Sequence, residues 1–127
     1  MRIQITPLFS GSTGNCILVQ AGGTNVLVDA GITAKALTGA LAQTGLRMDD
    51  IAAVLITHEH ADHIKGLPVL VKKYSTPVYA TEGTWRIMHF SQGCASTNKS
   101  IPCGIEYAFG MHFNFHRYIE YSFNFVL

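Results

Sequence analysis

The candidate metal ligands His58, His60, Asp62 and His63 lie within six residues near the middle of the chain. His58 and His60 are two positions apart, so in an extended segment they point the same way and can bind one ion. Asp62 and His63 are adjacent, and a sharp turn into a following helix would direct both toward a second point nearby. Because neutral imidazole and carboxylate suit zinc, manganese or iron, the spacing predicts a metal site.

Other interpretations of this segment are weaker. A solvated, histidine-rich loop would bind metal only by accident, but the mixture of His and Asp after an apolar run is not typical of a histidine tract. A structural zinc site usually includes cysteine, and no cysteine lies close to the segment. The helical His-Glu-x-x-His motif is excluded because position 62 is aspartate.

The neighbouring elements are those expected to position such a site. The apolar residues 51–56 predict a buried strand that ends where the polar segment begins, and open α/β sheets bind ligands at the carboxyl ends of their strands. Asp29 ends another predicted strand, over residues 25–28. A lone aspartate there most often caps a turn locally, and the alternative is that it reaches a neighbouring histidine.

Hydrophobic periodicity and turn residues predict the remaining elements of an α/β (α+β) domain. Strands are expected over residues 3–9, 16–19, 25–28, 51–56 and 76–80, and helices over 34–44, 68–74 and 82–90. Thr33 is the expected N-cap of the first helix. Val69, Leu70 and Val71 are expected on the buried side of the second. The Gly- and Ser-rich residues 10–15 favour a tight connection over a ligand-binding loop.

Length and composition limit the protein class. A chain of 127 residues is at most one domain, and 48% apolar residues are enough for a core. The formal charge of +1 indicates no broad basic surface for nucleic acid. The three cysteines have no metal-finger spacing and imply no disulfide framework, which fits a reducing cytosol. Because no segment resembles a signal peptide or a membrane span, we expect a cytoplasmic protein without a membrane partner.

Three motifs together resemble the metallo-β-lactamase superfamily of metal-dependent hydrolases. They are the segments Ser10–Asn15, Val26–Gly31 and His58–Leu67. In combination they resemble the YycJ/WalJ-type branch, whose members are described as DNA exonucleases. The resemblance covers about residues 1–92, which we expect to be the N-terminal half of such an enzyme.

The resemblance implies half of an αββα sandwich, in which a mixed sheet carries helices on one face. It also implies two divalent metal ions, zinc or manganese. His58 and His60 would hold one ion, and Asp62 and His63 the other. Asp62 could in addition accept a proton, which makes it the candidate catalytic residue. Asp29 is then expected to orient a ligand imidazole.

From about residue 93 the resemblance ends, so we expect residues 93–127 to be a divergent tail produced by truncation or a frameshift. Alternating apolar residues over 113–125 predict a strand or hairpin with one apolar face. No aspartate in the tail could bridge the two ions, although His112 or His116 could supply one imidazole.

The resemblance therefore favours a metal-dependent phosphodiesterase or DNA exonuclease that is incomplete in this chain. The alternatives are a hydrolase of a thioester or lactam, and a truncated, non-catalytic fragment that binds metal weakly. A nucleic-acid partner rests on the resemblance alone. A missing second sheet would leave apolar strand surface exposed, which favours self-association.

Overall fold

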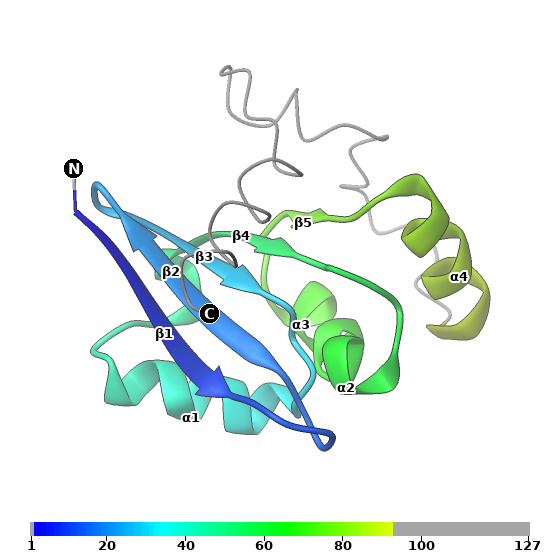
Figure 1. Cartoon of the computed structure of the whole chain (residues 1–127), viewed down its shortest axis with the longest axis horizontal. Helices are drawn as coiled ribbons and strands as arrows, with labels where there is room; N and C mark the ends of the chain where they lie inside the picture. The colour runs from blue at the N-terminus through cyan, green and yellow to red at the C-terminus, as the bar shows by residue number, and fades with distance from the viewer. Residues whose placement is uncertain (1, 93–127) are drawn as a thin grey trace, which may run out of the picture.

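The computed structural model describes residues 2–92 (Figure 1). In chain order its elements are β1 (Ile3–Phe9), β2 (Cys16–Ala21), β3 (Thr24–Val28), α1 (Ala34–Gln43), the 3-10 helix η1 (Met48–Asp50), β4 (Ile51–Leu55), α2 (Ala61–Ile64), α3 (Leu67–Lys73), β5 (Val78–Tyr79) and α4 (Glu82–Gln92). Each strand and helix predicted in this range is present. The predicted strand over 113–125 and the candidate ligands His112 and His116 lie outside the described residues.

The strands form one mixed sheet in the order β1-β2-β3-β4-β5. β1, β2 and β3 pair antiparallel, whereas β3 with β4 and β4 with β5 pair parallel. Gly22 and Gly23 close the β2–β3 hairpin with φ values of 55° and 83°, a conformation that favours glycine. The predicted mixed α+β architecture is confirmed.

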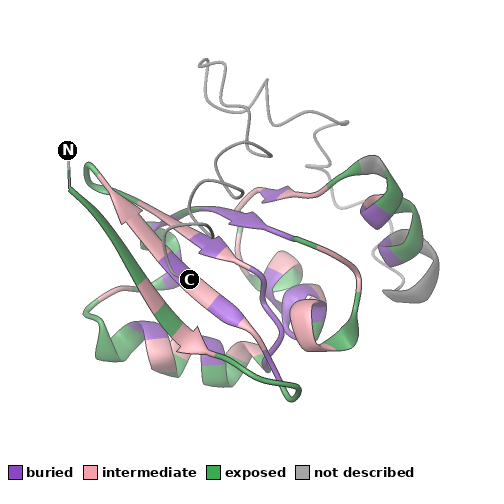
Figure 2. Ribbon diagram, in the orientation of Figure 1, coloured by how far each residue is buried: buried purple, intermediate pink, exposed green. Residues whose placement is uncertain are grey.

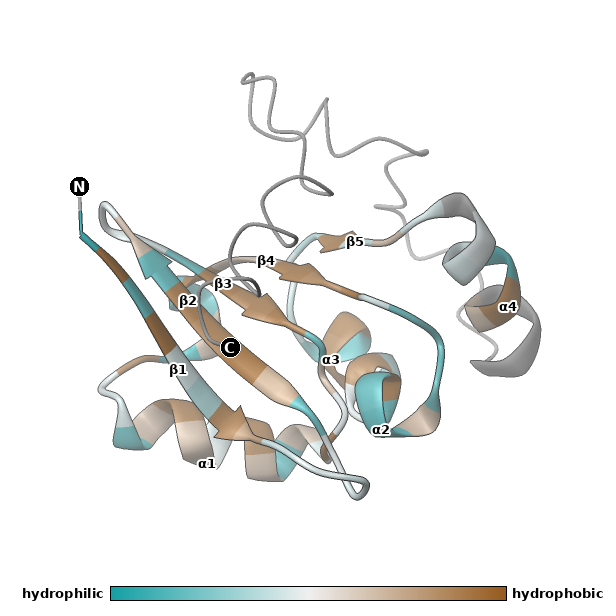
Figure 3. Cartoon of the chain, viewed as in Figure 1, coloured by the Kyte–Doolittle hydropathy of each residue, from teal (hydrophilic) through white to brown (hydrophobic). Residues whose placement is uncertain are grey.

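The main core lies between one face of the sheet and the helices. Since side chains alternate along a strand, Leu18, Leu27, Val54 and Val78 pair across β2 to β5 on that face. The buried helix residues of the same cluster are Leu37 and Leu41 of α1, Ile64 of α2, and Leu67 and Leu70 of α3. Figure 2 shows the buried positions of α1 and α3, and Figure 3 shows the apolar central strands.

One prediction about α3 is wrong. Val69 was expected on the buried side of this helix, but it is 53% exposed, whereas Leu67 and Leu70 are buried. Residues three apart share one side of a helix, and the two residues between them point elsewhere. Leu67 and Leu70 therefore define the side that packs, and Val69 faces away from it.

The opposite face of the sheet is also apolar. Ile5, Val19, Val26 and Ala53 lie next to one another across β1 to β4. Ile5 is 50% exposed, so this face reaches the surface at β1. None of the described helices is long and apolar enough to cross a membrane.

Candidate metal centre

The candidate centre lies at the carboxyl ends of β3 and β4. These strands are parallel neighbours, and Val28 pairs with Leu55 near their ends. Asp29 directly follows β3, and its backbone N–H donates to the Leu55 carbonyl at 2.7 Å. The φ value of Asp29 is 64°, a left-handed conformation that aspartate tolerates better than most residues. The chain therefore turns sharply where the polar segment after β4 begins.

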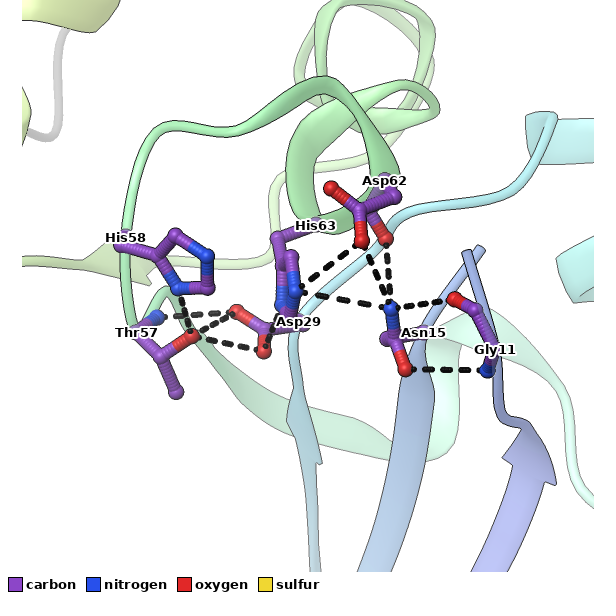
Figure 4. Close-up of polar contacts among 7 residues, drawn as sticks. All are labelled: Gly11, Asn15, Asp29, Thr57, His58, Asp62 and His63. Carbon is purple, nitrogen blue, oxygen red and sulfur yellow. Dashed lines mark hydrogen bonds and ion pairs between the residues drawn. The ribbon is translucent and has the colours of Figure 1, made fainter. Parts of the chain in front are cut away.

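The Asp29 carboxyl group is buried and ties this segment together (Figure 4). Its Oδ1 accepts a hydrogen bond from the Thr57 backbone N–H at 2.8 Å, and the Thr57 hydroxyl lies 3.0 and 2.8 Å from its two oxygens. Oδ2 lies 2.7 Å from His63 Nδ1. The prediction that Asp29 reaches a histidine is confirmed. The same carboxyl group binds Thr57 at the start of the polar segment and His63 at its end.

This contact fixes how the His63 ring presents itself. An ionised carboxylate only accepts hydrogen bonds, so the proton of a neutral His63 lies on Nδ1 and Nε2 keeps a lone pair. The Thr57 hydroxyl donates to Asp29 in the same way, so its oxygen can accept from His58 Nδ1, which is 2.9 Å away. Both rings then leave the lone pair of Nε2 free to bind a metal.

The three imidazoles lie close together. The centroids of His58 and His60 are 4.5 Å apart, and those of His58 and His63 are 3.9 Å apart. The spacing along the chain predicted two neighbouring pairs of ligands. The His58 ring lies nearer to His63 than to His60, so the two pairs adjoin each other.

Asp62 completes a pair of donors with His63. Asp62 Oδ2 lies 3.4 Å from His63 Nε2, and the two side chains are 31% and 17% exposed. Nitrogen and carboxyl oxygen are suitable donors for a divalent cation, so the residues fit the metal in kind. They fall short in number, because no group of three or more His, Cys, Asp or Glu side chains is arranged to hold an ion among the side chains that the structure describes.

Asn15 also lies in this centre. The sequence gave no reason to select it, because a lone asparagine is not a typical ligand for zinc. Its Nδ2 donates to Asp62 Oδ2 at 3.1 Å and lies 3.4 Å from His63 Nε2. Its backbone N–H donates to the Asp62 carbonyl at 2.8 Å. The only sequence signal was its place in the Ser10–Asn15 motif, which we interpreted as a tight connection.

Glycine allows the loops to pack this closely. A Cβ at Gly31 would lie 1.6 Å from the carbonyl oxygen of Asp62, and one at Gly14 would lie 2.8 Å from the carbonyl oxygen of Gly31. Neither position can hold a larger residue without displacing backbone. The predicted role of residues 10–15 as a tight connection is confirmed.

Cys16 lies in the core, and its thiol is buried. Burial raises the pKa of its thiol to about 12, and the charge of Asp29 adds to the shift. Without a metal ion the thiol therefore stays protonated at neutral pH, and we keep the nitrogen and oxygen donors as the candidate ligands.

Comparison with known proteins shows which family the chain belongs to. The sequence model of the metallo-beta-lactamase superfamily matches residues 10–100. The chain therefore belongs to this superfamily, as its motifs predicted. Membership suggests divalent metal ions at the centre.

Two curated relatives confirm the predicted similarity to the YycJ/WalJ-type branch. The chain is 44% identical over 99 residues to exodeoxyribonuclease YycJ of Bacillus anthracis, covering 78% of this chain and 38% of that protein. It is 42% identical over 93 residues to exodeoxyribonuclease WalJ of Streptococcus pneumoniae serotype 2, covering 73% and 35%. The chain thus spans little more than a third of either relative.

A solved structure shows the same partial coverage. A diphosphatase from the PhnP family superimposes with a TM-score of 0.55 and 26% identity, over 71% of this chain and 46% of that protein.

Proposed function

We propose that this chain carries part of the metal site of a hydrolase that cleaves phosphodiester bonds, with DNA exonuclease as the favoured activity. The observation that carries the proposal is the His63 ring, which Asp29 holds at Nδ1 while Nε2 lies 3.4 Å from Asp62 Oδ2. The two exodeoxyribonucleases similar to the chain support the choice of substrate.

We assign the ligands as the spacing suggested. His58 and His60 would hold one divalent ion, zinc or manganese, and Asp62 and His63 a second. Such ions would supply an activated water and positive charge to oppose the charge that develops on the substrate. Asp29 keeps the lone pair of His63 directed outward. Asp62 can accept a proton in the reaction, although a carboxylate that binds metal is a weak base.

The second candidate is a fragment that binds metal weakly and does not turn over. One observation favours it: no three donors among the described side chains are arranged to hold an ion, and a catalytic zinc normally has three protein ligands. We propose that the missing ligands lie outside residues 1–92 in full-length relatives, and that 93–127 is a divergent tail. Family-like sequence in another reading frame past codon 93 would support a frameshift; its absence would count against one.

We also propose that copies of the chain associate through the sheet face that includes Ile5, which is 50% exposed. The free, buried thiol of Cys16 fits a reducing compartment, and we propose the cytoplasm.

The test uses the whole chain. Zn²⁺ and Mn²⁺ are titrated calorimetrically, and cleavage of end-labelled DNA and of a generic phosphodiester is measured with each metal. Metal-dependent cleavage that His58→Ala abolishes would establish the hydrolase and rule out the inactive fragment. Weak binding that His58→Ala removes, without cleavage, would establish the fragment. A chain that binds neither ion would refute both.

A further inference from the structure

The side chain of Asn15 makes more contacts than its loop requires. Its Oδ1 accepts from the Gly11 backbone N–H at 3.2 Å, and its Nδ2 donates to the Gly11 carbonyl at 2.8 Å. Both of these bonds lie within the loop itself. The second N–H of the amide is directed instead at Asp62 Oδ2, 3.1 Å away, in a segment 47 residues further along the chain.

The amide is held firmly in this place. The Asn15 backbone N–H donates to the Asp62 carbonyl at 2.8 Å, and the Asn15 carbonyl accepts from the Gly31 N–H at 2.9 Å. With Gly11 bonded to both ends of the amide, the side chain has little freedom to turn. Figure 4 shows the amide between the Gly11 backbone on one side and Asp62 and His63 on the other.

Asp62 needs such a partner more than His63 does. The Asp62 side chain is 31% exposed, whereas His63 is already fixed at Nδ1 by Asp29. A partly exposed carboxyl group can rotate away into water unless a hydrogen bond holds it. Among the hydrogen bonds and ion pairs of the described residues, the Asp62 carboxyl has only Asn15 Nδ2 and the His63 ring.

We propose that Asn15 is a positioning residue that holds Asp62 Oδ2 beside His63 Nε2, so that both donors face one divalent cation. A carboxyl oxygen has two lone pairs, so Oδ2 can keep the bond from Asn15 and still bind the ion. This inference rests on the proposed function, since it assigns Asp62 and His63 to the same ion.

The test compares two leucine variants of the whole chain. Asn15→Leu keeps the approximate size of the side chain and removes the amide. Asn25→Leu is the matched control, because Asn25 also donates and accepts one side-chain hydrogen bond, with Asp50 and Gln20. Calorimetric titration with Mn²⁺ measures affinity, and thermal unfolding in chelator measures stability.

We expect Asn15→Leu to weaken Mn²⁺ binding roughly 10- to 100-fold, the range found when partners of metal ligands are removed. Asn25→Leu should leave the affinity unchanged. A purely structural role predicts a different result: Asn15→Leu would melt earlier in chelator but bind Mn²⁺ as tightly as the parent. That outcome would overturn the inference.

The two proposals can fail separately. If the parent chain binds no cation, the proposed function fails. The positioning role is then decided in chelator by the ¹³C resonance of the Asp62 carboxyl group. It should move in Asn15→Leu and not in Asn25→Leu, and an unmoved resonance refutes the role. If Asn15→Leu does not fold, Asn15→Ala replaces it in the resonance measurement, because it removes the amide without placing a charge beside Asp62.

Discussion

Replacing Asp29 by asparagine tests the hydrogen bonds of its carboxyl group with almost no change in side-chain shape. Asparagine also tolerates the left-handed φ of 64° at this position, so no backbone strain is added. The carboxyl group accepts from the Thr57 N–H and hydroxyl and from His63 Nδ1. An amide offers only one oxygen and a donor NH₂. At least one of these three donors therefore faces the NH₂ group of the new asparagine, which is itself a donor.

The magnitude follows from which bond is lost. If the amide NH₂ faces Thr57, a buried donor is left unsatisfied, which costs about 1–3 kcal/mol. If it faces His63, the ring moves its proton to Nε2 and loses the lone pair that would bind metal. In the first case we expect Asp29→Asn to destabilise the domain by roughly 2 kcal/mol, or about 8–16 °C in melting temperature. In the second we expect cation affinity to fall about 10- to 100-fold.

Thermal unfolding in chelator and calorimetric titration with Zn²⁺ measure the two effects. Asp49→Asn is the matched control, because its carboxyl group is 69% exposed and pairs with Arg47 at 3.1 Å on the surface. Such a pair contributes about 0–1 kcal/mol, so this variant should melt almost as the parent does. If Asp29→Asn melts with the parent and binds Zn²⁺ equally well, Asp29 does not organise the centre.

Three shorter predictions follow. Gly31→Ala should prevent folding or lower stability by more than about 3 kcal/mol, because its Cβ would meet the Asp62 carbonyl oxygen. Gly39→Ala in α1, where a Cβ meets nothing within 4 Å, should instead add about 0.5–1 kcal/mol of stability. Denaturant unfolding measures both changes. Cys16 should resist alkylation in the native protein when the other cysteines are replaced by serine. Because the pKa of its thiol is about 12 when folded and 9.0 as its ordinary value, the folded state binds more protons above pH 9.0, so stability should fall as the pH rises toward 12 in thermal melts. Ile5→Lys should reduce self-association in sedimentation, and an unchanged distribution would locate the contact elsewhere.

The sequence was sufficient to locate the elements within residues 2–92, because strand and helix signals are local. Thr33 was predicted to cap α1, and its hydroxyl does accept from the Ala36 N–H at 3.2 Å. Val69 was misplaced because three consecutive apolar residues do not reveal which side of a short helix faces the core. That choice is made by packing against the sheet, which the local pattern does not contain.

The candidate site was only partly predictable, for the same reason. The histidines and Asp62 could be selected because they are neighbours along the chain. Asn15 could not, because its contact with Asp62 joins segments 47 residues apart and an asparagine in a Gly- and Ser-rich loop is typical of turns. The close approach of His58 to His63 also depends on how the turn after β4 folds, and periodicity does not predict it.

The residues that make the centre possible are mostly not its donors. α2 spans only Ala61–Ile64. A single turn of helix is not stable alone, because the entropy lost in ordering its residues exceeds the free energy gained from its few hydrogen bonds. Its position depends on backbone bonds from loops formed early in the sequence: the Asn15 N–H donates to the Asp62 carbonyl, and the Ala30 N–H to that of His63, each at 2.8 Å. The geometry of the donor segment is therefore set by the loops after β1 and β3, which supply none of the four predicted ligands.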